Sequence, residues 1–163
     1  NLYFRNSIIL EGRKNNEKVI DYVLDKISKF IKNNKLDNKI KITLLGLAFK
    51  GYPETDDVRG SITLRLINFF KTKYNIKVNI YDPVIQKNEI KKYGTPCKDL
   101  TTAIKNSKII VVCNNHYEFY KINNNILNKY MAKDSLIYDF WNIIKANNNN
   151  LKASKIKKFG VIN

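Results

Sequence analysis

The chain has 163 residues, a hydrophobic fraction of 44% and a formal net charge of +16. A chain of this length forms one ordinary domain and buries roughly two thirds of its unfolded surface, so it needs no disulfide or metal to fold. We expect no membrane span, since no apolar run approaches roughly 20 residues, and no signal peptide opens the chain. Cys97 and Cys113 lack the spacing of a disulfide framework or a zinc site, which favours a reducing cytoplasm.

The positive charge leaves two interpretations open. Lysine dominates the 30 basic residues, of which only four are arginine: Arg5, Arg13, Arg59 and Arg65. Lysine is accompanied by abundant Asn, Ile and Tyr, the residues that A/T-rich codons supply, so the charge reflects either background composition or selection for an anionic ligand or partner. Lysines scattered over several faces attract phosphates but read bases poorly.

The sequence pattern of the amino-terminal part predicts a helix and no strand. Residues 1–6 begin with Asn-Leu-Tyr-Phe, which resembles a protease-site linker added for expression, and they are left out of the functional argument. From Glu17 to Ile31, apolar residues recur at steps of three and four, the pattern of one helix face. Because this helix precedes the first strand, we expect residues 7–36 to form a linking arm and residues 37–163 to form the domain.

From residue 37 onward, strands are expected to alternate with helices. The predicted strands are Lys39–Phe49, Lys77–Tyr81, Lys108–Cys113, Ser135–Phe140 and Phe159–Ile162. The predicted helices are Val58–Tyr74, Val84–Lys92, Leu100–Asn106 and Ile126–Met131, and Asn147–Asn150 is predicted to be only a loop. The apolar runs of the strands are continuous rather than alternating, which indicates a parallel sheet covered on both faces. The expected fold is α/β, with a doubly wound parallel sheet and right-handed crossovers.

The loop after the first strand is the first candidate site, because ligands of open parallel sheets bind beyond the carboxyl ends of the strands. Gly46 and Gly51 have the spacing of a Walker loop, but Tyr52 stands where the lysine belongs, and no G-x-G-x-x-G is present. We therefore expect no self-contained site for ATP or NAD. What remains is Lys50 near a helix start, where backbone amides favour anions.

Two acidic residues in this loop have competing interpretations. Asp56 and Asp57 oppose an anion unless they cap the following helix or pair with Arg59. Arg59 in turn either reaches the ligand or forms that structural ion pair. Both possibilities stay open for Arg59, whereas loop architecture is the favoured role of the two aspartates.

The segment Gly46–Ser61, GLAFKGYPETDDVRGS, closely resembles the G-[LF]-A-F-K…[TD]-D-x-R-x-S segment of the UDP-glucose/GDP-mannose dehydrogenase family. That segment opens the family's carboxy-terminal domain. The resemblance continues in order through Val78–Pro83, through Ile109–His116 with Glu118-Phe119, and through Leu136–Asn142. Upstream, Gly12–Glu17 resembles the helix that links the family's central domain to this one. The match covers about residues 8–163 and implies a Rossmann-like UDP-sugar-binding domain.

Enzymes of this family oxidise the C6 alcohol of a nucleotide sugar to a carboxylate in two NAD-dependent steps. The resemblance implies that NAD and the catalytic Gly-x-Cys segment belong to an amino-terminal part that nothing in this chain resembles; neither Cys97 nor Cys113 lies in that motif. We therefore expect the chain alone to be inactive, and hydride transfer to NAD would contradict this interpretation. The full-length enzyme is expected to be a homodimer formed through its central helices.

The resemblance also implies roles for individual residues. Lys50, with Phe49 beside it, is expected to touch the UDP-sugar, and Arg59 is a further candidate. Trp141 either stacks on a base or packs against the fold. Structural roles at the site are expected for Gly46, Asp56, Asp57 and Asp139, and elsewhere for His116.

Two departures from the family pattern leave the sugar open. Four residues separate Lys50 from Thr55 where many members have two, so the loop is longer. Members specific for UDP-glucose often carry Arg two residues after the strand-end Asp, and here Trp141 occupies that position after Asp139.

Two other classes of protein remain as alternatives. A basic Rossmann-like module would bind nucleic acid or another polyanion, with a strong dependence on salt. A regulatory or assembly module would bind only protein. The family motifs disfavour nucleic acid as a partner.

Overall fold

The computed structural model describes residues 8–151 and 154–158. The chain divides into two compact units, residues 1–37 and residues 38–163. In the first, helix α1 (Ile8–Asn33) begins well before the predicted Glu17, because residues 8–16 contain no proline and several good helix formers. Among the helices in the described part of the chain, none combines the length and the apolar character needed to cross a bilayer.

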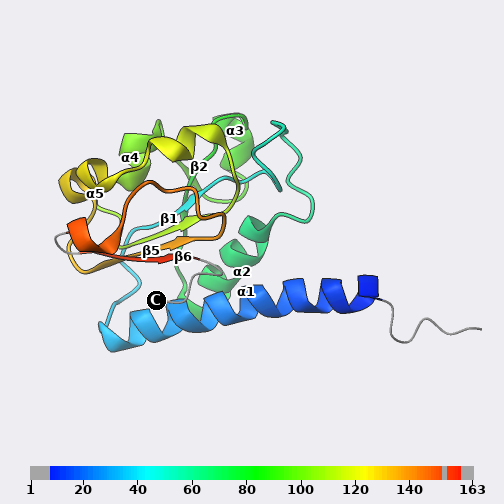
Figure 1. Cartoon of the computed structure of the whole chain (residues 1–163), viewed down its shortest axis with the longest axis horizontal. Coiled ribbons are helices and arrows are strands. Elements are labelled where there is room, and N and C mark those ends of the chain that lie inside the picture. Colours follow the sequence, from blue (N-terminus) through cyan, green and yellow to red (C-terminus); the bar gives the residue numbers. More distant parts are fainter. Residues whose placement is uncertain (1–7, 152–153, 159–163) are drawn as a thin grey trace, which may run out of the picture. The chain divides into compact units, whose positions relative to one another are not determined.

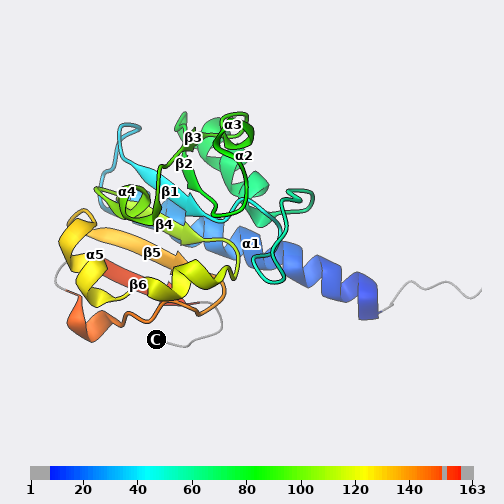
Figure 2. The ribbon, with the colours of Figure 1, turned by 90° about the horizontal axis from the view of Figure 1, so that it is seen from above.

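The second unit is built on a parallel sheet. Its strands are β1 (Ile42–Leu45), β2 (Asn79–Tyr81), β3 (Thr95–Pro96), β4 (Ile109–Val112), β5 (Ser135–Asp139) and β6 (Ser154–Lys158). They lie in the order β3-β2-β1-β4-β5-β6, and every pair is parallel (Figure 2). The strand order reverses between β1 and β4, as in doubly wound nucleotide-binding folds. The predicted fold class is confirmed.

Helices cover both faces of this sheet. Helix α2 (Ile62–Tyr74) lies on one face, and α4 (Leu100–Ile104) and α5 (Asn124–Tyr130) lie on the other (Figure 1). The short helix α3 (Lys87–Ile90) connects β2 to β3. Two 3₁₀ turns, η1 (Tyr117–Lys121) and η2 (Asn148–Asn150), complete the described elements.

Local chemistry shortens the first strand and the first helix of the sheet domain relative to the prediction. Strand β1 ends at Leu45 and not at Phe49, because Gly46 turns the backbone with φ of 94°. Helix α2 begins at Ile62 and not at Val58, because Ser61 is its N-cap and accepts a hydrogen bond from the Thr63 amide at 3.1 Å. Asn75, in the left-handed region, ends the helix.

The core on the α4/α5 face is formed by inward side chains of four strands. Leu45, Val112, Ile137 and Ile156 belong to one buried cluster with Leu127 of α5. Every residue of β1, β4 and β5 is buried, as the continuous apolar runs predicted. A core this closely packed fixes the positions of the strand ends, where the candidate site lies.

The carboxyl end of the chain was predicted to contain a loop and a last strand. The predicted strand Phe159–Ile162 lies outside the described residues, and the structure has β6 just before it. Asn147–Asn150 is more than a loop, so that prediction was wrong. The Asn148 side chain accepts from the Ile156 amide at 2.7 Å and donates to the Ile156 carbonyl at 3.1 Å, which fastens η2 to the edge strand.

Leu127→Ala is expected to lower the free energy of unfolding by about 2–5 kcal/mol, because it removes a buried side chain from a core that relaxes only in part. Urea denaturation followed by circular dichroism measures the change. Asn125→Ala, at an exposed position of the same helix, is the control and should change stability by less than about 0.5 kcal/mol. Equal effects of the two substitutions would contradict this description of the core.

Candidate functional site

The candidate site lies at the carboxyl ends of β1 and β4. These strands pair in register, with Leu45 opposite Val112, so the chain segments that follow them start side by side. Residues 46–61 form the loop after β1, and residues 113–116 follow β4; both lie at the same edge of the sheet (Figure 2). This edge, where the strand order reverses, is the position at which doubly wound sheets bind ligands.

Gly46 allows these two segments to meet. Its φ of 94° is one that side-chain-bearing residues rarely adopt, and a Cβ atom there would lie 2.4 Å from Cγ of Asn114. The Asn114 amide group occupies that space and donates to the Ala48 carbonyl at 3.2 Å. The Gly46 carbonyl accepts from Thr63 Oγ1 at 2.6 Å, which ties the turn to α2. The turn is therefore fixed from both sides.

Asp82, directly after β2, holds the start of the same loop. One carboxylate oxygen of this buried side chain accepts from the amides of Leu47 at 2.7 Å and Ala48 at 3.1 Å. The other accepts from the amides of Val84 at 2.9 Å and Ile85 at 3.1 Å. One carboxylate thus satisfies four backbone donors from two loops.

Asn115 and His116 hold the next part of the loop. Asn115 Oδ1 accepts from the amides of Gly51 at 2.9 Å and Tyr52 at 3.1 Å. The backbones approach so closely that a Cβ on Gly51 would lie 2.0 Å from the His116 nitrogen. Only glycine fits at position 51.

The His116 ring makes a second attachment. Its Nδ1 accepts from the Glu118 amide at 3.1 Å, so the proton of the neutral ring lies on Nε2, which donates to Glu54 Oε1 at 2.9 Å. The His116 side chain is 2% exposed and that of Glu54 is 50% exposed. This geometry supports the structural role expected of His116. Its hydrogen-bond partner Glu54 could not be identified from the sequence.

Lys50 lies between these attachments. It is half-buried, its ammonium lies 5.3 Å from the Phe49 ring centroid, and it forms no ion pair with any residue that the structure describes. Phe49 is 43% exposed. A free cation beside an exposed aromatic ring is suited to a ligand that carries both phosphate and an apolar face.

Arg59 is engaged by a neighbour. Its guanidinium donates to both oxygens of Asp57, through Nε at 2.9 and 3.1 Å and through Nη2 at 2.7 Å. These hydrogen bonds, with one from the Arg59 amide, lower the pKa of Asp57 to about 2. Neither aspartate caps α2, since Ser61 does so, and Asp56 is exposed. Of the two open interpretations of Arg59, the geometry therefore favours the structural ion pair.

Trp141 and Asp139 bring the end of β5 to the site. Asp139 is buried and accepts from the amides of Trp141 at 3.1 Å and Ile144 at 2.9 Å. The Trp141 indole donates to the Cys113 carbonyl at 3.0 Å, yet the side chain is 44% exposed. Its edge is thus fixed to the fold and its remaining surface is open to a ligand.

No described group is arranged as a nucleophile or a metal site. Burial raises the pKa of the Cys113 thiol to about 12, and burial also raises the pKa of Cys97. Both cysteines therefore stay protonated at neutral pH. Among the residues that the structure describes, no cluster of His, Cys, Asp and Glu side chains could hold a metal ion.

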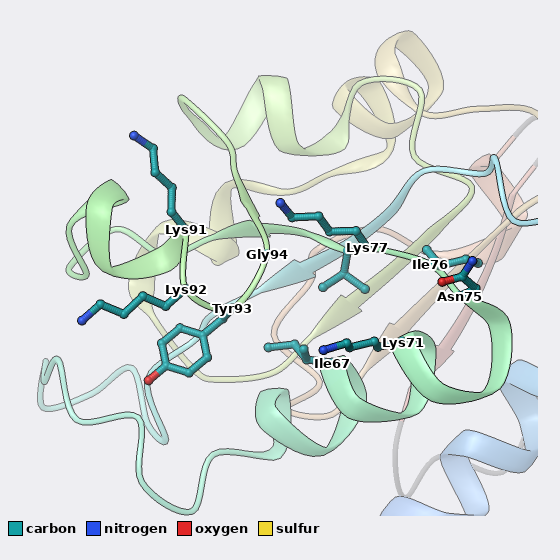
Figure 3. Close-up of a pocket in the computed structure, with 10 residues that line it drawn as sticks. Ile67, Lys71, Asn75, Ile76, Lys77, Lys91, Lys92, Tyr93 and Gly94 are labelled. Carbon is teal, nitrogen blue, oxygen red and sulfur yellow. The ribbon is translucent and has the colours of Figure 1, made fainter.

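Two hollows border the described residues, one away from the site and one beside its loop. One, of about 350 Å³, lies between the end of α2 and residues 91–94, and lysines border it (Figure 3). Lys91 donates to Asn88, Lys92 pairs with Glu89, and both side chains extend away from the other lining residues (Figure 3). The other, of about 580 Å³, lies beside the loop and is lined by Glu54, Thr55, Asp56, Val58, Val84, Ile85, Gln86 and Glu89. Lys91 and Lys92 are thus not directed at a ligand in the first hollow, and the described residues that line the second hollow include carboxylates and no basic residue.

Sequence reasoning missed the residues that hold the loop. Asn115 and Asp82 each accept from consecutive backbone amides, and neither stood out by residue type. A signal was present, because each follows the carboxyl end of a strand next to β1 in the predicted parallel sheet. Polar residues at that position are close to the loop whatever their exact register.

The fold and the candidate site define a doubly wound α/β domain whose candidate ligand-binding side chain is a lysine, and comparison with known proteins identifies its family. The profile of the UDP-glucose/GDP-mannose dehydrogenase family, UDP binding domain, matches residues 43–146. The chain belongs to this family, as the sequence motifs predicted.

Individual relatives are dehydrogenases of the same family. The chain is 25% identical to UDP-N-acetyl-D-glucosamine 6-dehydrogenase of Salmonella typhi over 150 residues, which are 89% of this chain and 34% of that protein. It is also 25% identical to UDP-N-acetyl-D-mannosamine dehydrogenase of Methanococcus aeolicus, over 86% of this chain and 30% of that protein. The structure of UDP-N-acetyl-mannosamine dehydrogenase from Staphylococcus aureus aligns with a TM-score of 0.71 and 25% identity, over 98% of this chain and 35% of that one. The chain thus spans about a third of the relatives it matches.

Arg59→Ala is expected to raise the pKa of Asp57 from about 2 toward its ordinary 3.8, though not all the way, because the amide of residue 59 still donates to the carboxylate. The folded-state pKa is depressed, so the pair stabilises the loop above about pH 4 and that contribution is lost as the pH falls toward 2. A carbon NMR titration of the Asp57 carboxyl measures the shift. Arg65→Ala is the control; an unchanged Asp57 in Arg59→Ala would refute the assignment.

Proposed function

We propose that this chain is the nucleotide-sugar-binding part of an NAD-dependent UDP-sugar 6-dehydrogenase, and that Lys50 contacts the ligand. The observation that carries the proposal is Lys50, a half-buried residue in the loop at the switch point of the sheet whose ammonium has no ion-pair partner among the described residues. Its neighbour Phe49 offers an exposed ring to a base or sugar face. Trp141 offers a second ring from the end of β5.

The chemistry of the loop supports a ligand held by side chains and not by a backbone cradle. A dinucleotide-binding loop needs free amides for the pyrophosphate. Here Asp82 takes the amides of Leu47 and Ala48, and Asn115 takes those of Gly51 and Tyr52. This loop therefore lacks the backbone cradle of a dinucleotide-binding loop, and we assign NAD, which accepts the hydride in such enzymes, to a part of the parent protein outside this chain.

The proposal extends to the substrate and to the parent protein. Two relatives are named for UDP-N-acetylhexosamines, and Trp141 stands where an arginine marks many UDP-glucose enzymes, so we favour an N-acetylhexosamine as the sugar. The parent enzyme is proposed to be a cytoplasmic homodimer. Nucleic acid is not proposed as a partner, because the chain belongs to a UDP-binding domain family and because Lys91 and Lys92 extend away from the α2 hollow that they border (Figure 3).

Calorimetric titration with UDP tests the central proposal. The wild-type chain is expected to bind UDP saturably, and Lys50→Ala is expected to weaken binding about tenfold or more, because a charged hydrogen bond contributes about 1.5–3 kcal/mol. Lys105→Ala, at an exposed lysine after α4, is the matched control and should bind as wild type.

Salt dependence separates this proposal from a polyanion-binding module. Between 50 and 200 mM salt, site-specific UDP binding is expected to weaken modestly, whereas binding through many phosphate contacts falls by orders of magnitude. The proposal fails if UDP binds no better than inorganic phosphate or if Lys50→Ala and Lys105→Ala lose affinity equally.

A further inference from the structure

We propose that Asn115 is a positioning residue for Lys50. Its side-chain oxygen holds the backbone of Gly51 and Tyr52, which directly follow Lys50, and so helps to set the direction of the ammonium. This inference rests on the proposed function, in which Lys50 contacts the nucleotide sugar. It adds to that function a residue from the segment after β4, separated from Lys50 by 65 positions in the sequence.

The backbone around Lys50 is bracketed by hydrogen bonds. On its amino side, the Ala48 carbonyl accepts from Asn114 at 3.2 Å and the Phe49 amide donates to the Asp57 carbonyl at 3.0 Å. On its carboxyl side, the amides of Gly51 and Tyr52 both donate to Asn115 Oδ1. The hydrogen bonds before Lys50 join residues 48–49 to both Asn114 and Asp57. Those after Lys50 depend on a single atom, Asn115 Oδ1.

The position of Asn115 Oδ1 is fixed by the sheet. Asn115 lies three residues after β4, a wholly buried strand that pairs with β1 on one side and β5 on the other. Gly51 lies so close to the His116 backbone that the loop cannot shift toward it. The loop is therefore seated against a rigid element and held there by Asn115.

The contact between His116 and Glu54 attaches the next part of the loop to the same segment. The buried, neutral His116 ring donates from Nε2 to Glu54, three residues beyond Gly51. Asn115 and His116 thus attach two successive parts of the loop, at residues 51–52 and at residue 54. With both attachments made, the extra residues between Lys50 and Thr55 are ordered before a ligand arrives.

Prior ordering has a defined consequence for binding. A lysine side chain loses rotamer freedom when it grips a phosphate, and a mobile backbone beneath it adds a further entropic cost. Holding the backbone in place removes that second cost. The effect of Asn115 on affinity should therefore exist only while Lys50 is present.

A double-mutant cycle on the full 163-residue chain tests this, with UDP affinity measured by calorimetry. Asn115→Ala is expected to weaken UDP binding about fivefold to tenfold in the wild-type background and less than twofold in the Lys50→Ala background. Asn125→Ala, the same chemical change on the exposed face of α5, is the control and should leave affinity unchanged in both backgrounds. Hydrogen exchange of the Gly51 and Tyr52 amides should accelerate in Asn115→Ala and not in Asn125→Ala.

The possible outcomes separate this inference from the proposed function. Equal losses from Asn115→Ala in both backgrounds, or no loss in either, overturn the positioning role while leaving Lys50 as the ligand contact. A Lys50→Ala variant that binds UDP as wild type overturns the proposed function and this inference with it. If Asn115→Ala does not fold, Glu54→Ala at the half-exposed end of the second attachment replaces it, and its smaller loss should again vanish without Lys50.

Discussion

The parallel pairing of β1 with β4 is the constraint on which the candidate site depends. It brings the loop after β1 against the segment Asn114–His116, so that residues more than 60 positions apart in the sequence are in contact. Gly46 and Gly51 permit the approach, because a side chain at either position would collide with that segment. Asn114, Asn115 and His116 then hold the loop at three successive points. Without this pairing, none of these contacts would form.

The same contacts decide what kind of ligand the site suits. Backbone amides that could cradle a pyrophosphate are already satisfied by Asp82 and Asn115, so the loop is a rigid support and not an anion nest. In the proposed function, ligand contact is left to side chains that project from the loop, above all Lys50 and Phe49. Rigid backbone with a projecting cation is a preorganised arrangement, which reduces the cost of binding.

Much of this could be predicted from the sequence, for identifiable reasons. Continuous apolar runs such as Lys108–Cys113 indicated a buried parallel sheet, and the GLAFK…TDDVRGS segment indicated the family. The helix cap at Ser61 and the clamps at Asp82 and Asn115 were missed, since each depends on long-range or turn geometry that residue type does not encode. The two-residue strand β3, which contains Pro96 at the sheet edge, was too short for any periodic signal.

The most direct test of where this domain binds its ligand is backbone amide NMR of the nitrogen-labelled chain titrated with UDP. If the ligand binds at the carboxyl ends of β1 and β4, the largest chemical-shift changes fall on residues 47–52 and 113–116. Changes centred on residues 75–78 and 91–94, around the lysine-bordered hollow at the other end of β2 (Figure 3), would contradict it.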